Sequence, residues 1–141
     1  MTEVSIQKSL FDRFLTLNTY SGKPYIKDNN SNVAFPNKSF KQPADNKWFN
    51  LWFKCNEPNS VGLGEEAQNE YTGFFQIDIC TPLNKGEDEP NAKYGYIASL
   101  FKRGTTFDDV IVDKVYRSGI EVEGNHYKTI VTVLWTARID N

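Results

Sequence analysis

The sequence has little of what most metal, redox and nucleic-acid chemistry needs. Its 141 residues include one histidine and two cysteines, and the formal net charge is −2. Structural zinc sites draw four ligands from closely spaced Cys and His, and Cys55 and Cys80 have no C-x-x-C spacing. Phosphate backbones attract clustered Lys and Arg, which a near-neutral chain lacks. We therefore expect no metal, no cofactor and no specific nucleic-acid binding.

Long apolar runs are absent too. No stretch approaches the roughly 20 residues of a membrane-spanning helix, and residues 1–10 lack the basic segment and apolar core of a signal peptide. We expect a cytosolic protein without membrane contact, in which Cys55 and Cys80 are reduced, buried thiols.

Catalytic groups are equally scarce. His126 is the one candidate base for a Ser or Cys nucleophile, and its place after a Gly-Asn turn favours an exposed surface histidine. Residues 62–64, Gly-Leu-Gly, lack the third glycine and the following helix of a nucleotide-binding loop. The acidic clusters fall in polar turns, where carboxylates are normally solvated: residues 65–66, 87–89 and 108–109. We predict that the protein is not an enzyme.

Aromatic residues, in contrast, are plentiful: ten Phe, seven Tyr and three Trp provide large areas for burial. A chain of this length corresponds to a single domain, residues 1–141. Helical spacing of apolar residues predicts a first helix over residues 3–18 and a second that starts near Asn91, with a stripe of Tyr94, Ile97 and Phe101. Gly104 ends the second helix.

Alternating apolar residues predict strands over residues 48–56, 71–82, 108–117 and 126–138, with a break at 118–125. Residues 19–46 read as a long polar loop with a short strand near 32–35. Two hairpins separated by a helix indicate an α+β fold. We expect an antiparallel sheet of four to five strands with two helices packed on it, and we leave open a parallel pairing at the edge of the sheet.

The strand at residues 48–56 is apolar on both faces. Phe49 and Leu51 lie on one face, and Trp48 and Trp52 on the other. Such a strand is either covered on both sides or exposed to a partner. Two alternatives therefore stand for the tryptophans: they anchor an interface, or they lie beneath the first helix.

Three motifs carry a family resemblance. The second strand contains Tyr71, Gly73, Gln76, Ile77, Asp78 and Ile79 in the pattern Y-x-G-x-x-Q-[VI]-D-[VI]; the second helix ends in Phe101, Arg103, Gly104 and Thr105 as F-x-R-G-T; and the last strand opens with Tyr127. In order and spacing these resemble tail terminator-like proteins of long-tailed bacteriophages and prophages, the lambda-type tail completion family. The element order agrees over residues 3–138 and the motifs over 71–107 and 127–135, whereas residues 19–47 are longer and more polar than in that family.

The resemblance implies a structural virion protein. It implies a homo-oligomeric ring of six copies that caps the tail-tube protein, ends tube polymerisation and offers a surface to head-completion or neck proteins. DNA would pass through the lumen without specific binding. Assembly in the host cytoplasm would place the ring at the head-proximal end of the tail.

A closed ring of identical subunits needs two complementary patches on each copy. Trp48 and Trp52 form one candidate patch, because tryptophan is a favoured interface anchor. Arg103, beside Thr105, is a candidate partner for the acidic residues Glu65 and Glu66 of a neighbouring copy, and the alternative is a solvated charge at a helix end. Two other functions remain open: a neck connector or tail-tube subunit of related fold, and a small ligand-binding domain or enzyme.

Overall fold

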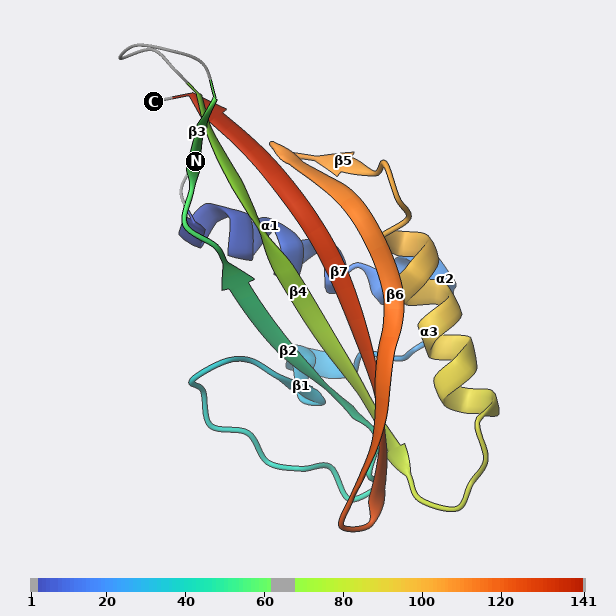
Figure 1. Ribbon diagram of the computed structural model, residues 1–141. Coiled ribbons are helices and arrows are strands. Elements are labelled where there is room, and N and C mark those ends of the chain that lie inside the picture. Colours follow the sequence, from blue (N-terminus) through green and yellow to red (C-terminus); the bar gives the residue numbers. More distant parts are fainter. Residues whose placement is uncertain (1–2, 62–67, 141) are drawn as a thin grey trace.

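A strongly twisted sheet forms the body of the protein (Figure 1). The computed structural model describes residues 3–61 and 68–140. Within them, seven strands form one sheet in the order β1-β2-β4-β7-β6-β5, with β3 also paired to β4. In chain order the elements are α1 (Glu3–Phe14), α2 (Leu17–Ser21), the 3-10 helix η1 (Asp28–Asn30), β1 (Val33–Ala34), β2 (Trp48–Cys55), β3 (Asn59–Val61), β4 (Gln68–Pro82), α3 (Asp88–Leu100), β5 (Thr106–Phe107), β6 (Val110–Glu123) and β7 (His126–Asp140).

The long strands β2, β4, β7 and β6 are antiparallel neighbours, and β1 adds to β2 in parallel. The expected α+β class is therefore correct, and the parallel pairing of β1 makes the sheet mixed at this edge. The expected count of four to five strands, which included the short strand near residues 32–35, is too low because it omits β3 and β5. These two strands have only two or three residues each and carry no readable alternation, so only their pairing to a long neighbour defines them.

One face of the sheet is apolar because side chains alternate along each strand. On β4 the side chains of Phe75, Ile77 and Ile79 are fully buried, as the alternation predicts. On β7 the same face carries Val131, Val133 and Trp135. This face forms the core.

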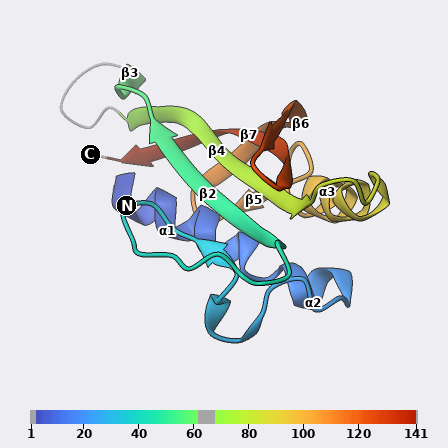
Figure 2. The same ribbon diagram turned by 90° about the horizontal axis from the view of Figure 1, so that it is seen from below.

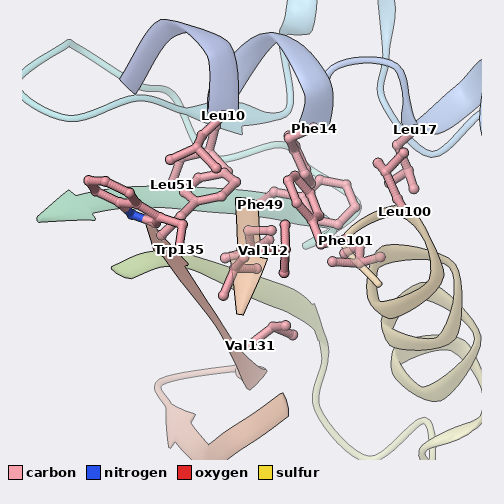
Figure 3. Close-up of a cluster of buried hydrophobic side chains, with 14 of the residues drawn as sticks. Leu10, Phe14, Leu17, Phe49, Leu51, Leu100, Phe101, Val112, Val131 and Trp135 are labelled. Atoms are coloured by element: carbon pink, nitrogen blue, oxygen red, sulfur yellow. The ribbon is translucent and has the colours of Figure 1, made fainter. Parts of the chain in front are cut away.

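Helices cover that face, and none of the described residues forms a helix over the other (Figure 2). From α1 come Ile6, Leu10 and Phe14, and from α3 and its end come Ile97, Leu100 and Phe101, all buried. In the core (Figure 3), the Phe14 and Phe49 rings meet edge to face with centroids 5.2 Å apart. Full burial of each such side chain stabilises the fold by roughly 1.5–3 kcal/mol.

Both helices differ from their predicted bounds. The first breaks after Phe14, and a short second segment, α2, starts at Leu17 and ends at Ser21, where Gly22 caps it at φ +70°. The other, α3, starts at Asp88, not Asn91, since Pro90 is tolerated in a first helical turn and the carboxylates of Asp88 and Glu89 favour the positive end of the helix dipole.

A buried lysine changes the predicted stripe of α3. The buried positions are Pro90, Lys93, Ile97 and Leu100, whereas Tyr94 is half-buried. The Lys93 ammonium lies 3.2 Å from the Glu89 carboxylate, which also binds Lys47 at 3.2 Å. Burial lowers the pKa of Lys93, against the opposing effect of Glu89. These ion pairs attach the end of the long loop to α3.

The expected loop at residues 19–46 is better ordered than its composition suggests. It contains most of α2, all of η1 and the strand β1, where a short strand was predicted. The Asn18 side chain holds the backbone of Ile26 through two hydrogen bonds of 2.6 and 2.7 Å. Ile26 and Val33 are buried in the core cluster. A side-chain amide thus makes the backbone hydrogen bonds that a helix or strand would otherwise provide.

The predicted break at residues 118–125 is wrong. Strand β6 continues to Glu123 and pairs with β7 down to His126. Register shifts at Val112/Lys114 and Arg117/Gly119 interrupt the alternation, as β-bulges do, and they hide the strand from a period-two pattern. Only Gly124 and Asn125 form the turn.

No helix within the described ranges is both long enough and apolar enough to span a membrane.

Gly73 lies where two strands and a tryptophan meet. It pairs with Cys55 on one side and Trp135 on the other. A Cβ at this position would lie 2.0 Å from the Lys54 carbonyl oxygen and 2.7 Å from the Trp135 ring. The Trp135 ring also stacks on Phe53 with centroids 5.5 Å apart. The glycine of the Y-x-G motif therefore makes room for the core tryptophan.

We predict that Gly73→Ala lowers the free energy of unfolding by about 1–3 kcal/mol or more, because the methyl group must displace backbone. Urea denaturation followed by circular dichroism measures the change. Gly95→Ala is the matched control: Gly95 is exposed in α3 with open space around its Cβ position, and alanine there should stabilise by up to about 1 kcal/mol. Equal stabilities of the Gly73 variant and the wild type would contradict the packing argument.

Candidate interaction surface

Metal-binding and redox groups do not come together in the described part of the chain. No cluster of three or more His, Cys, Asp or Glu side chains there could hold a metal ion. Cys55 and Cys80 are both free thiols, half-buried and buried respectively. Burial raises the pKa of Cys80 to about 12.

The face of the sheet opposite the helices carries both predicted tryptophans of β2. Trp48 is buried even so: its ring meets Phe40 of the long loop and the imidazole of His126 at centroid distances of 6.4 and 4.7 Å. Its Nε1 donates to Asn50 at 3.1 Å. The helix α1 packs on the other face of β2, so the alternative that placed the tryptophans beneath α1 is wrong.

His126 was expected to be an exposed surface residue, and this too is wrong. Its side chain is 13% exposed and lies 3.5 Å from the Glu123 carboxylate across the hairpin. The hairpin turn itself is exposed, but the neighbouring tryptophan ring covers the imidazole. Trp48 belongs to a distant segment of the sequence, so local sequence could not reveal the contact.

Trp52 is the exposed member of the pair. The side chain is 49% exposed, and its Nε1 donates to the Asp78 carboxylate at 3.0 Å. Asp78 is only 2% exposed. It accepts further hydrogen bonds from Gln76 at 2.9 Å and Asn50 at 3.5 Å. An exposed indole is therefore held by a buried carboxylate.

Asp78 also acts on a neighbouring strand. Burial alone would lower the pKa of Lys128, but a hydrogen bond to Glu123 and the charge of Asp78 raise it. Reasoning from sequence missed this polar cluster. Gln76 and Asp78 were part of the recognised motif, but no role was assigned to them. The strand alternation could have revealed the cluster, because it places both residues on the same face of the sheet as the tryptophans of the paired strand.

A groove of about 580 Å³ opens beside Trp52. One wall is β2 at residues 50–52, and the other is residues 34–40, which leave the sheet where β1 ends. Of the described residues that line it, Lys38 alone is charged. β1 pairs with Phe49 and Asn50 only, so β2 has no strand partner on this side from Leu51 onward within the described ranges.

The second predicted patch follows α3 at the other side of the sheet. Gly104 adopts φ +86°, the left-handed region that favours glycine. Its amide donates to the Val112 carbonyl at 2.8 Å, and the Val112 amide donates to the Thr105 carbonyl at 2.9 Å. This pairing joins the helix end to β6. Arg103 is exposed and Thr105 is half-buried.

The six predicted interface residues therefore do not form one site. Trp48 and Trp52 belong to β2, near one end of the strand order, and Arg103 and Thr105 precede β5, at the other end. Glu65 and Glu66 lie outside the described residues. Two separated surfaces are what head-to-tail contact between copies requires.

The chain is similar to one known protein family and to solved structures. A family model described as phage tail terminator protein matches residues 6–135. A solved structure of a protein without a descriptive name shares the fold, with a TM-score of 0.73 and 14% sequence identity over 97% of this chain and 96% of that one. A chain from the virion of a native gene transfer agent particle reaches a TM-score of 0.48 and 11% identity over 96% and 94% of the two chains, which is too low to carry an argument. No curated protein matches the sequence.

We predict that Asp78→Asn releases the indole of Trp52. The amide has one acceptor oxygen where the carboxylate had two, so a donor from Trp52 or Gln76 must face an NH₂ group. The free energy of unfolding should fall by about 1–3 kcal/mol in urea denaturation. The ¹⁹F signal of 5-fluorotryptophan at position 52 should shift and sharpen as the ring gains motion. Asp109→Asn, at an exposed carboxylate, is the control. An unchanged Trp52 signal would remove Asp78 from this role.

Proposed function

The chain belongs to the phage tail terminator family, and from that membership we propose that it is the subunit of a ring that caps a finished tail tube. The protein is a structural component of a phage tail. The proposed ring contains six copies, stops further addition of tube subunits and presents a surface to a head-completion or neck protein. It assembles in the host cytoplasm and occupies the head-proximal end of the tail. DNA passes through its lumen without specific binding.

One observation favours head-to-tail assembly over a two-fold dimer. The two candidate patches lie at opposite ends of the strand order: Trp52, the exposed one of the two predicted tryptophans, lies at one end, and Arg103 and Thr105 lie at the other. A two-fold dimer uses one patch twice, whereas a closed ring uses two different patches that meet head to tail. We propose that Arg103 faces Glu65 and Glu66 of the next copy.

We predict that the purified protein forms closed rings, alone or on isolated tail tubes. Native mass spectrometry gives the copy number, and negative-stain images give the shape. A tail-tube subunit, the second candidate, would instead polymerise into tubes. A protein that stays monomeric at every concentration and never associates with tubes would contradict the proposal.

We also predict that Arg103→Glu weakens ring formation by about tenfold, since it reverses a charge at the proposed contact. Its melting temperature should stay within about 2 °C of the wild type, because an exposed substitution changes stability little. Sedimentation velocity measures the association. Lys23→Glu, an equal charge change at an exposed residue on the loop after α2, is the control. Unaltered assembly of the Arg103 variant would remove this residue from the contact.

A further inference from the structure

The two side edges of the sheet have complementary outlines. On one edge, β1 extends β2 only at Phe49 and Asn50. Across β4 and β7, the pairing puts Phe49 level with Ile120 of β6, where β6 has no outer neighbour among the described residues. On the other edge, β5 extends β6 at Val110 and Ile111, beyond the level at which β2 ends. Each edge therefore projects where the other recedes.

A head-to-tail ring brings these two edges together. β2, β4, β7 and β6 alternate in direction and β1 is parallel to β2, so β1 and β6 run in opposite directions. A rotation about an axis along the strands keeps the level, the face and the direction of every residue in each copy. It places the end of β6 antiparallel beside β1 of the next copy, with Ile120 opposite Val33 and Val122 opposite Ser31.

The outer side of β1 can receive a strand. The Phe49 amide donates to the Asn32 carbonyl at 2.9 Å, so the alternating backbone turns the N–H and C=O of Val33 away from β2. No strand in the described part of the chain pairs with this side. A pocket of about 230 Å³ opens there, and its lining includes Val33 and residues 38–41. An unpaired edge of this kind is a template for a strand of another chain.

The end of β6 carries side chains that need cover. Ile120 and Val122 are 48% and 60% exposed, and the pairing of β6 with β7 turns both to the helix side of the sheet, the side of the Val33 side chain. Glu121 and Glu123 face the opposite side, with side chains 54% exposed. Exposed apolar side chains on an unpaired edge favour association with a partner.

Lysines of the long loop complement these carboxylates. Glu121 is level with Trp48, and Phe40 packs on the Trp48 ring on the same face of the sheet, with centroids 6.4 Å apart. This part of the loop therefore lies on the face of the glutamates. Lys38 and Lys41 line the pocket, are exposed, and form no ion pair with a described residue. A carboxylate of a second copy would pair with them.

We propose that Ile120–Glu123 of one copy adds as an antiparallel strand to the outer edge of β1 in the next copy. Its two apolar side chains pack on the strand side of the pocket, beside Val33 and Phe35, and Glu121 lies beside Lys41. The same rotation brings β5 next to the bare end of β2. This inference rests on the proposed ring and names a contact that closes it.

Cysteine pairs test the register of the contact. In a Cys55→Ser background, Ser31→Cys and Val122→Cys place thiols at exposed positions that the pairing puts opposite each other. A mixture of the two variants should form a disulfide-linked heterodimer on mild oxidation, read by non-reducing electrophoresis and intact mass. Ile111→Cys, at an exposed residue near the other end of β6, is the matched control and should not cross-link to Ser31→Cys.

Charge variants test the contact without a new bond. Glu121→Lys and Lys41→Glu should each raise the dissociation constant of self-association about tenfold, and both changes in one chain should restore most of the affinity. Val122→Ser should weaken association by a similar factor of about ten, whereas Val4→Ser, at an exposed valine on α1, should leave it unchanged. Sedimentation velocity measures association, and circular dichroism melting shows that each variant is folded.

The outcomes separate the pairing from the ring. Rings that persist in every variant without the heterodimer cross-link overturn the pairing and leave the ring intact. Equal cross-linking of Ser31→Cys to Val122→Cys and to Ile111→Cys overturns the register. A Val122→Cys variant that cross-links to itself as readily indicates hairpins that meet across a two-fold axis, and it too overturns the pairing. A wild-type protein that never self-associates, with or without tail tubes, overturns both the pairing and the proposed function.

Discussion

The fifteen-residue pairing of β4 with β7 is the constraint on which the rest of the structure depends. It runs without a register shift from Gln68↔Asp140 to Pro82↔His126. Because side chains alternate along both strands, this one register sends Phe75, Ile77 and Val131 to the helix side and Gln76 and Asp78 to the other. It also sets Trp135 beside Gly73. If β7 slipped by one residue relative to β4, its core side chains would turn to the opposite face of the sheet, and Trp135 would lose the space that Gly73 leaves.

The same arrangement explains the two open edges. With β4 and β7 in the centre, β2 and β6 become the outer long strands, and among the described residues the two-residue strands β1 and β5 alone lie beyond them. Natural proteins usually protect such edges with charge, bulges or covering segments. Here the bulges of β6 lie in its first two-thirds, and its last four residues are regular and exposed, with the apolar Ile120 and Val122 alternating with Glu121 and Glu123. In the proposed ring, neighbouring copies would cover these edges.

The cluster around Asp78 also makes sense in an assembly. Burying a carboxylate among neutral donors stabilises a fold little, and often less than apolar packing would. Its effect here is to fix the indole of Trp52 at the surface, and a fixed aromatic side chain is a favourable interface anchor. Trp48, four residues earlier on the same face, is instead enclosed by Phe40 and His126. Two tryptophans with equivalent positions in the strand pattern therefore have different environments.

Sequence by itself determined what depends on short-range pattern: the α+β class, the core faces of the long strands, the helical stripe of α1 and the left-handed turn at Gly104. Each follows from a period or a backbone preference that acts within a few residues. Tertiary structure decided what depends on distant partners. The burial of Lys93 depends on Tyr25 and Phe49, whose ring centroids lie 5.6 and 5.4 Å from its ammonium nitrogen. The enclosure of His126 depends on Trp48, and β7 holds the bulged continuation of β6. Exposure or burial of a tryptophan at the sheet surface likewise depends on which distant segment crosses it, and no local pattern carries that information.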